Sequence, residues 1–515
     1  MSKSHKKIKR HIRENKEVIY VRPRRCIACT ACALTCAKST KISVLRLSLP
    51  DKKVIVPKKD TFDNSNCIYC GQCTLFCPTG AIDSDNPEEK VLAAKEANKY
   101  MVAIFAPSVR ATLGEEFNLP IGTDVSPKLA TSARLAGFNK VFETDFGADL
   151  TIVEEAHELL ERIKNNGILP MFTSCCPAWI NWVERFRRDL LPHISTCKSP
   201  QQMIGATIKT YFAEKNNLAP ENIFVTSIKP CTAKKFEATR NGMGRNNYSD
   251  INAVFTVREY ANFLKEKGIN INNIPSTEPD DFLDTTTAGG AIFGSSGGLL
   301  RSALRTLLYY LKETPEEIEK VANIRLTDLE GFSGVKVINY KTKDLTLKTA
   351  AVSGISNLIK FLDSGLWKDY QFIEVMACSG GCVNGGGAPK VKKEVNINEK
   401  LCISCGTCID NCPAGALEFN SKKVSSVSID RCVRCTLCSN LCRSNAISMD
   451  YYDKSTNTKL ERNYIDLRKE VLENIDKTLP VKYSHENKDI KELYKSYLGN
   501  IGGSKAEDLL HIKYN

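Results

Sequence analysis

Cysteines follow three apolar, strand-like segments that lie far apart in the sequence. PMFTSCCPAW leads to Cys175 and Cys176, FVTSIKPCTAKKFE to Cys231, and FIEVMACSGGCVNGGG to Cys378 and Cys382. In open α/β sheets, ligands bind beyond the carboxyl ends of the strands. Three such strands in one sheet would therefore bring these thiols to a single point. The pattern predicts a metal site at one edge of a sheet.

A second cysteine pattern, Cys-x2-Cys-x2-Cys-x3-Cys, occurs four times. It is the run that bacterial ferredoxins use to bind 4Fe-4S clusters. Structural zinc is the alternative, but zinc sites do not require four cysteines within eleven residues, twice in tandem. The runs are Cys26, Cys29, Cys32 and Cys36; Cys67, Cys70, Cys73 and Cys77; Cys402, Cys405, Cys408 and Cys412; and Cys432, Cys435, Cys438 and Cys442.

The fourth cysteine of such a run reaches across to the partner cluster, which predicts four ligand sets. Of the 22 cysteines, only Cys197 belongs to neither pattern, and we interpret it as an ordinary buried residue. The predicted sets are Cys26, Cys29, Cys32 with Cys77; Cys67, Cys70, Cys73 with Cys36; Cys402, Cys405, Cys408 with Cys442; and Cys432, Cys435, Cys438 with Cys412.

The composition indicates a large globular protein of the cytoplasm. At 515 residues with 42% hydrophobic content, the chain is long enough for roughly three domains. The cysteines have the spacing of metal ligands rather than of a disulfide scaffold. This favours a reducing compartment. No apolar run approaches the roughly 20 residues of a membrane span, and the basic start is not followed by a signal-peptide core. We therefore expect no membrane span.

The net charge of +13 is concentrated partly in SKSHKKIKRHIRENK and in RPRR, just before the first cysteine. Such charge runs are usually solvated tails. A docking surface for an acidic electron-transfer partner is the second interpretation, because complementary charge speeds encounter. Nucleic-acid binding ranks third, since no recognition motif and no aromatic stacking residues accompany the basic ones. We expect no nucleic-acid partner.

The strand-end motifs TSCCPAW, PCTAKKFEA and EVMACSGGCVNGGG resemble the three signature motifs of the FeFe (iron-only) hydrogenases. The resemblance covers about residues 95–390 and roughly 464–515, and includes FGADLTIVEEAHELLERI, CKSPQQM and AEDLLHIKY. It implies an α/β catalytic domain with two lobes of parallel-rich sheet and flanking helices. Two α+β bacterial ferredoxin-like domains would be added to it.

The expected domain organisation places one ferredoxin-like unit inside the catalytic domain. A basic tail (1–25) precedes a first ferredoxin-like domain (26–95). The catalytic domain (96–390) is then interrupted by a second ferredoxin-like domain (391–460) and completed by a C-terminal segment (461–515). We expect the second ferredoxin-like domain to be a second entry point for electrons.

In the hydrogenase family the cofactor is the H-cluster, a 4Fe-4S cubane joined through one cysteine to a two-iron unit that carries carbonyl, cyanide and azadithiolate. The resemblance implies that Cys176, Cys231, Cys378 and Cys382 hold the cubane, with Cys382 as the bridge. Cys175 would be the proton-passing thiol, with simple packing as the alternative. Four accessory 4Fe-4S clusters complete the implied set.

The resemblance also implies a proton path and a set of wall residues. Glu155, Glu158 and Arg162 lie on one face of an expected helix, a spacing equally typical of a salt-bridged surface. The family's relay assigns them, with Ser195, to proton transfer toward Cys175. Donors to the two cyanides would be Pro107 and Ser108 on one side and Lys234 on the other, and the further wall residues are Gln201, Phe293 and Met376. Packing is an equal alternative for Phe293 and Met376.

Lys229 stands where the family usually has methionine, immediately before Pro-Cys. Either its side chain points away from the cofactor, or it brings an ammonium close to an electron-rich cluster. In the second case the charge would stabilise the reduced state, and burial would lower the lysine's own pKa. The substitution Lys229→Met is then expected to lower the cluster's midpoint potential.

The resemblance implies an oxidoreductase that interconverts dihydrogen with protons and electrons. Electrons would pass through the clusters to a ferredoxin-like, acidic carrier, and maturation proteins would install the two-iron unit. Two other classes remain open. One is a dihydrogen sensor with slow turnover, and the other is a non-catalytic iron–sulfur protein similar to the hydrogenase-like assembly factors. The complete relay, with Cys175 and Cys382, argues against the last class.

Overall fold

The computed structural model describes residues 17–48, 54–245, 247–281, 283, 285–341 and 345–515. The basic stretch 2–16 lies outside the described residues. Among the helices in these ranges, none is long and apolar enough to cross a membrane.

A four-stranded parallel sheet forms one half of the catalytic region, in the order β11-β8-β5-β6. Side chains of β5 alternate between two apolar clusters, one on each face, so the sheet is buried on both sides as parallel sheets are. Its strands are β5 (Tyr100–Phe105), β6 (Lys140–Glu143), β8 (Ile223–Lys229) and β11 (Ala253–Thr256). Helices α3 (Glu88–Glu96), α5 (Ser126–Ala136) and α11 (Val257–Glu266) cover one face, and α6 (Asp145–Lys164) and α8 (Pro200–Thr207) the other.

The second half is a five-stranded sheet, in the order β12-β13-β14-β15-β7. Strands β14, β15 and β7 are parallel, whereas β12 and β13 are antiparallel additions at one edge. The strands are β7 (Met171–Phe172), β12 (Thr327–Asp328), β13 (Val335–Lys341), β14 (Thr346–Ser353) and β15 (Phe372–Met376). The helices that pack on it include α7 (Pro177–Phe186), α13 (Gly298–Tyr310), α14 (Pro315–Asn323) and α15 (Ile355–Asp363).

The expectation that the three cysteine-ending strands share one sheet is wrong. Strands β7 and β15 belong to the five-stranded sheet, but β8 belongs to the four-stranded one. Helix α6 lies between the two sheets and contributes apolar side chains to the core of each, with 14 of its 20 residues buried. Because both sheets pack on this helix, the carboxyl ends of their parallel strands meet at one place. The cysteines therefore converge although their strands do not pair.

The N-terminal cysteine runs lie in a small α+β unit whose borders differ from those expected. Strand β1 (Ile19–Val21) pairs with β4 (Ile82–Ser84), so the unit begins before residue 26. Helix α3 packs Val91 and Ala94 into the core of the four-stranded sheet, so the unit ends before α3 rather than at residue 95. Its other elements are α1 (Ala31–Thr40), β2 (Leu45–Leu47), β3 (Ile55–Pro57) and α2 (Gln72–Phe76).

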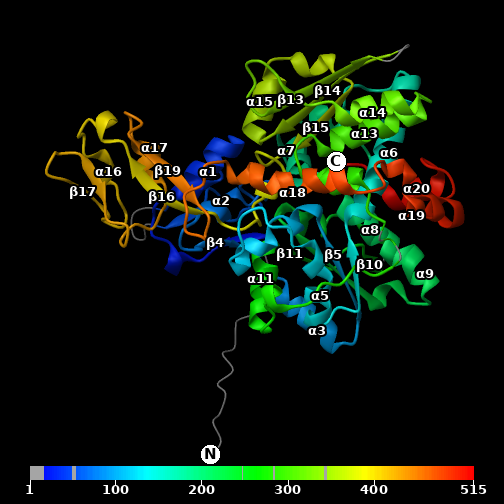
Figure 1. The fold of residues 1–515 in the computed structure, drawn as a ribbon, viewed down its shortest axis with the longest axis horizontal. Coiled ribbons are helices and arrows are strands. Elements are labelled where there is room, and N and C mark those ends of the chain that lie inside the picture. Colours follow the sequence, from blue (N-terminus) through cyan, green and yellow to red (C-terminus); the bar gives the residue numbers. More distant parts are fainter. Residues whose placement is uncertain (1–16, 49–53, 246, 282, 284, 342–344) are drawn as a thin grey trace, which may run out of the picture.

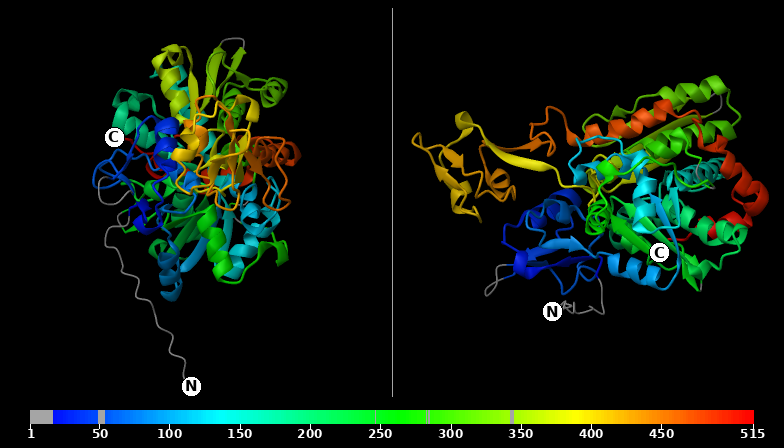
Figure 2. Two further views of the ribbon diagram at one scale, coloured as in Figure 1. Left: turned by 90° about the vertical axis from the view of Figure 1, so that its left-hand side faces the viewer. Right: turned by 60° about the horizontal axis from the view of Figure 1, so that its bottom comes forward.

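The second pair of cysteine runs lies in a unit whose two ends are side by side. Strand β16 (Lys392–Ile397) pairs antiparallel with β19 (Ile447–Tyr452), so the chain leaves and re-enters the catalytic region at one place. Adjacent ends are what an inserted unit requires. Between these strands lie α16 (Thr407–Asp410), β17 (Leu417–Phe419), β18 (Ser425–Val427) and α17 (Leu437–Leu441). Figures 1 and 2 show this inserted unit, coloured yellow to orange, projecting from the remainder of the molecule.

The C-terminal helices pack back on the region formed by the two sheets. They are α18 (Tyr464–Thr478), α19 (Lys488–Leu493) and α20 (Ser504–Leu510). Arg468 of α18 is 1% exposed and donates from two nitrogens to the Glu115 carboxylate, at 2.7 Å each. It also donates to the carbonyl oxygens of Val383 and Pro389, at 2.9 and 3.2 Å.

The substitution Arg468→Met should lower the free energy of unfolding by about 3–5 kcal/mol, because it leaves Glu115 buried without its countercharge. Chemical denaturation of the full chain measures the change. Arg462→Met is the matched control, since Arg462 pairs with Glu470 at the exposed surface of the same region. Equal stability of the two variants would contradict the role given to the buried pair.

Candidate active site

A cavity of about 90 Å³ lies where the carboxyl ends of parallel strands from both sheets meet. Many of its wall residues lie at or after the carboxyl ends of five strands: β5, β6, β7, β8 and β15. Other segments contribute Cys70, Gln201 and Phe293. The residues that the sequence analysis placed around the cofactor, including the proton-passing thiol, all line this cavity. They are Pro107, Ser108, Cys175, Cys176, Gln201, Lys229, Cys231, Lys234, Phe293, Met376, Cys378 and Cys382.

Six cysteines line this cavity: five come from the three strand-end loops, and Cys70 comes from the second N-terminal cysteine run. The amide of Ala377 donates to Cys176 Sγ at 3.4 Å, and Gln72 Nε2 donates to Cys378 Sγ at 3.3 Å. Gly381 has φ of 97°, and a Cβ there would lie 2.7 Å from the Ser296 amide nitrogen. Only glycine lets the loop approach so closely. Several thiols in a pocket of low polarity fit an iron–sulfur cluster, for which thiolate is the usual ligand.

Two buried polar atoms of the cavity residues have no hydrogen-bond partner among the described residues. They are Ser108 Oγ and Gln201 Oε1. A buried polar group without a partner is uncommon and costly, so each such atom calls for a ligand. Gln201 is held in place on its other side, where Nε2 donates to Glu237 Oε2 at 3.1 Å. The Ser108 hydroxyl can donate and Gln201 Oε1 can accept, so the walls fit an iron-containing group that carries both hydrogen-bond acceptors and a donor.

Lys234 is oriented by a carboxylate that the sequence analysis missed. Its Nζ donates to the carbonyl of Cys175 and to both oxygens of Glu237, each at 3.0 Å. Burial lowers the pKa of Lys234, but Glu237 and the nearby thiols outweigh burial and leave the pKa above its ordinary value. Lys234 therefore presents a charged donor to the cavity. Glu237 was recognisable only by its position three residues after the lysine.

Lys229 does not point away from the cavity. Its side chain is 4% exposed, lines the wall, and donates from Nζ to Thr144 Oγ1 at 2.5 Å. Burial and the neighbouring Lys234 lower its pKa well below the ordinary value for lysine. The sequence left open whether Lys229 points away from the cofactor or lies close to it. Its place in the cavity wall favours the second alternative.

Three of the predicted relay residues are joined by hydrogen bonds, and Glu155 lies beside them. Arg162 donates to Glu158 Oε1 at 2.7 Å, and Ser195 Oγ donates to Glu158 Oε2 at 2.8 Å. Glu155 is fully buried, accepts from the Ser174 amide at 3.3 Å through Oε1, and has no partner at Oε2 among the described side chains. Burial, followed by the charge of Glu158, raises the pKa of Glu155 to about 8. Glu155 is therefore protonated at neutral pH.

The raised pKa of Glu155 predicts a pH-dependent stability. Between about pH 4.5 and 8 the folded protein keeps a proton on Glu155 that the unfolded chain releases, so this group's contribution to stability falls as the pH rises. Glu155→Gln keeps a neutral side chain at every pH. The variant's melting temperature relative to the wild type should therefore rise between about pH 5 and about pH 8. A constant difference across this range would contradict the raised pKa.

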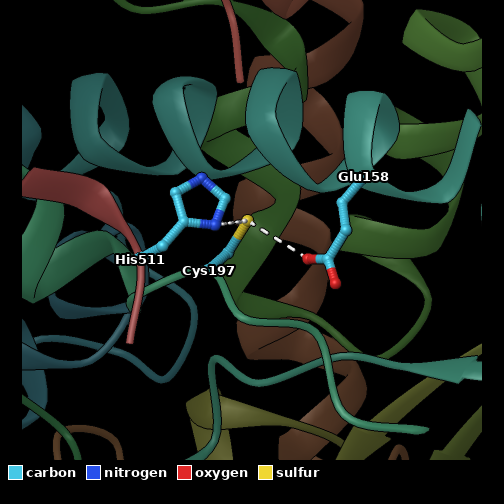
Figure 3. Close-up of side chains that lie close together, drawn as sticks. All are labelled: Glu158, Cys197 and His511. Carbon is cyan, nitrogen blue, oxygen red and sulfur yellow. Dashed lines mark hydrogen bonds between the residues drawn. The ribbon is translucent and has the colours of Figure 1, made fainter. Parts of the chain in front are cut away.

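Cys197 has a more specific environment than an ordinary buried residue. Its Sγ lies 3.9 Å from Glu158 Oε2 and 4.0 Å from His511 Nδ1, as Figure 3 shows. The same imidazole hydrogen bonds to Thr196 Oγ1 at 2.8 Å and, through Nε2, to Glu154 at 3.2 Å. Glu, Cys and His are metal-ligand types, but the Glu158 carboxylate is already bound by Arg162, Ser195 and the Thr196 amide. We interpret the group as a hydrogen-bonded extension of the relay.

The ferredoxin-type cysteines group in space in the described structure. Two small cavities are lined by the four-thiol sets Cys26, Cys29, Cys32 with Cys77 and Cys432, Cys435, Cys438 with Cys412. Burial raises the pKa of Cys67, Cys70 and Cys73, and the nearby Cys36 thiol adds to this effect at each of them. Cys402 and Cys408 both lie near Ser425, Cys442 packs in one cluster with Cys408, and Cys405 is exposed.

A buried multi-cysteine cavity joined to two small units with four cysteine runs defines an iron–sulfur redox protein. Comparison with known proteins agrees. The family model described as "Iron only hydrogenase large subunit, C-terminal domain" matches residues 99–386, and "Iron hydrogenase small subunit" matches 462–515. The 4Fe-4S binding domain model matches residues 60–83 and 395–418.

The similar proteins include named hydrogenases. Iron hydrogenase 1 of Clostridium pasteurianum is 35% identical over 512 residues, which are 98% of this chain and 77% of the relative. The solved structure of apo FeFe-hydrogenase HydA1 from Chlamydomonas reinhardtii has 29% sequence identity and a TM-score of 0.61, and the match covers 83% of this chain and 98% of that one. The chain belongs to the iron-only hydrogenase family.

A relative of a different class also matches. Cytosolic iron-sulfur assembly component 3 of Bos taurus is 31% identical over 345 residues, which cover 63% of this chain and 71% of the relative. Overall similarity therefore does not separate the two classes, and the residues of the cavity have to do so.

Proposed function

We propose that this protein catalyses the reversible interconversion of dihydrogen with protons and electrons. The observation that carries the proposal is one buried cavity lined by six cysteines and two polar side chains with unpartnered atoms, close to the residues of the proposed proton relay. When bound there, an H-cluster supplies the iron centre at which dihydrogen is split or formed. The protein supplies binding, orientation, proton transfer and exclusion of water.

The residues have separate roles toward this cofactor. Cys176, Cys231, Cys378 and Cys382 would hold the cubane, and Cys382 would bridge to the two-iron unit. Hydrogen bonds to cyanide would come from the Ser108 hydroxyl, the backbone after Pro107 and the charged Lys234, because charged donors form the stronger bonds. Gln201, Phe293 and Met376 would close the wall around the unit.

Protons would move along the chain Arg162, Glu158, Ser195, Glu155 and Cys175. Each carboxyl and hydroxyl can both donate and accept, as a relay requires. The free Oε2 of Glu155 supports this order, because it is the atom left to receive a proton from the Cys175 side. Ser195 and Arg162 donate to different oxygens of the Glu158 carboxylate. The proton would pass from Ser195 through Glu158 to the solvent side of the carboxylate, where Arg162 holds it in place.

A catalytic protein is favoured over a non-catalytic assembly factor by the complete set of residues around the cavity. Cys382 would be needed to anchor a two-iron unit, and Cys175, Glu155 and Glu158 have a purpose only where protons are consumed or released. A dihydrogen sensor would need the same residues. Fast turnover with an artificial electron acceptor distinguishes the enzyme from the sensor.

The arrangement of units supports a finer assignment. We infer that the two sheets are the two lobes of the catalytic domain and that the units around residues 17–84 and 391–460 are ferredoxin-like, each with two 4Fe-4S clusters. The expected partners are a ferredoxin-type, acidic electron carrier and the maturation proteins that install the two-iron unit. We expect a cytoplasmic location, in keeping with reduced cysteines.

The test of the function is isotope exchange between deuterium gas and ordinary water. Protein carrying an installed two-iron unit should produce HD from deuterium gas in ordinary water without any electron carrier, because cleavage and re-formation at one site suffice. It should also reduce methyl viologen with dihydrogen. Fully loaded protein that does neither would overturn the proposal.

Lys229→Met should lower the midpoint potential of the cubane. The amine is a polar donor in the cavity wall, and donors or positive charge near a cluster stabilise its reduced form. Redox titration followed by electron paramagnetic resonance (EPR) measures the shift, with Lys229→Gln as the variant that keeps an N–H donor. Equal midpoints in the wild type and the methionine variant would remove this role.

A further inference from the structure

The inserted unit contacts the N-terminal ferredoxin-like unit at a small apolar junction formed by their cysteine loops. Cys29 and Ala31 of one unit pack with Cys435 of the other, and all three are less than 10% exposed. Ile27, Val433 and Leu437 surround them. The side chains of Cys29 and Cys435 therefore belong to one apolar cluster that spans the two units. Each of these two cysteines belongs to a different predicted cluster.

Polar and cation–π contacts beside the apolar junction hold it in place. Lys390, just before β16, donates to the Cys77 carbonyl at 2.6 Å. Lys393 lies over the Phe76 ring, with Nζ 4.8 Å from the ring centroid. Lys38 of α1 donates to Asn440 Oδ1 of α17. Three separate contacts around the apolar centre define one relative position of the two units.

The N-terminal unit in turn contacts the catalytic cavity through its second cysteine run. Cys70 lines the cavity, and Gln72 Nε2 donates to Cys378 Sγ and to the Asn384 carbonyl, at 3.3 and 2.9 Å. A Cβ on Gly386 would lie 2.3 Å from the Cys70 carbonyl oxygen, so the two loops touch. By contrast, the described lining of the cavity includes no residue of 391–460. The inserted unit has no comparable contact there.

We propose that the inserted unit exchanges electrons with the catalytic cavity only through the N-terminal unit, so that the accessory clusters act in series. This inference rests on the proposed function. From the cavity outward, the order is the set around Cys70, the set around Cys29, the set around Cys435 and the set around Cys405. Figure 1 agrees, since the blue N-terminal unit lies between the yellow inserted unit and the catalytic helices.

The outermost set is then the site of exchange with a one-electron carrier. Cys405 is exposed, and the neighbouring Ile403 is 64% exposed. Each dihydrogen oxidised would release two protons through the relay and two electrons, which pass singly from a reduced to an oxidised cluster and leave at Cys405. In this proposal, the second entry point for electrons expected from the sequence is connected to the catalytic cavity through the N-terminal unit.

Two full-length variants test the order. Cys29→Ala with Cys32→Ala removes the cluster on the inner side of the junction. Val433→Lys with Leu437→Lys keeps every cysteine but places charge in the apolar contact. Iron content and dithionite-reduced EPR spectra show which clusters each variant retains. Protein is kept dilute so that transfer between molecules is slow.

In the wild type, dihydrogen should reduce the clusters of both units. In either variant, it should still reduce the set around Cys70, while the inserted clusters should be reduced by dithionite but not by dihydrogen beyond the intermolecular background. Reduction of the inserted clusters at the wild-type rate in the Cys29 and Cys32 variant would overturn the series order.

A second readout does not depend on hydrogenase activity. Dithionite-reduced wild type should show spin–spin splitting between the clusters on either side of the junction, and the splitting should be lost in the Val433 and Leu437 variant. Identical spectra in the wild type and in this variant would contradict the proposed contact between clusters across the junction. A wild type that dihydrogen cannot reduce would contradict the proposed function, and the splitting would then decide the order by itself.

Discussion

Replacing Cys175 with alanine should reduce dihydrogen turnover by at least about a thousandfold, because it removes the group that links the cofactor position to the relay. The thiol is fully enclosed, lines the cavity, and has a pKa that burial and Glu155 raise well above the ordinary value. It therefore exists as a neutral proton donor. No other thiol in the described cavity is adjacent both to the expected two-iron position and to Glu155.

Iron content and infrared spectra distinguish a loss of proton transfer in this variant from a loss of the cofactor. Iron content and the carbonyl and cyanide infrared bands of Cys175→Ala should match those of the wild type, since Cys175 is not among the expected ligands. Cys382→Ala is the contrasting variant and should lose these bands. Near-normal turnover in a fully loaded Cys175→Ala variant would refute the assigned relay.

Glu158→Gln should reduce turnover by about a hundredfold, because Glu158 is the point at which the hydrogen bonds from Ser195 and Arg162 meet. An amide keeps the shape but cannot release a proton. Glu161→Gln is the matched control on the same helix, where the carboxylate is exposed and bonds to Asn165. The two variants should differ widely in turnover and little in melting temperature.

A comparable loss in both variants would show that the effect comes from helix α6 rather than from proton transfer. His511→Ala adds a further comparison, because His511 contacts Cys197 and Thr196 beside Glu158. If the network in Figure 3 is part of the relay, turnover in this variant should fall while cluster content stays constant.

The cysteine spacings predicted the chemistry of the site, but not how the strands are shared between sheets. An apolar strand that ends in cysteine looks the same whether it joins one sheet or another. Helix α6 decides this point, and the burial of all its residues from Asp145 to Ala156 between two sheets is a tertiary property that periodicity along EEAHELLER does not reveal. The surface interpretation of Glu155 failed for the same reason, since that side chain is fully buried.

Contacts that depend on distant parts of the chain were also missed. Glu237 binds Lys234 within one short helix, but its importance appears only because Lys234 lines the cavity. The contact of Cys29 with Cys435 joins residues that are 406 positions apart, by their numbers in the sequence. The two runs have identical spacing, so nothing local distinguishes an inner cluster from an outer one.

The infrared spectrum of the purified, matured protein tests the central claim most directly, because carbonyl and cyanide stretches report the two-iron unit itself. The account predicts these bands in the wild type, their change under dihydrogen, and their loss in Cys382→Ala. Active protein without carbonyl and cyanide bands would contradict it.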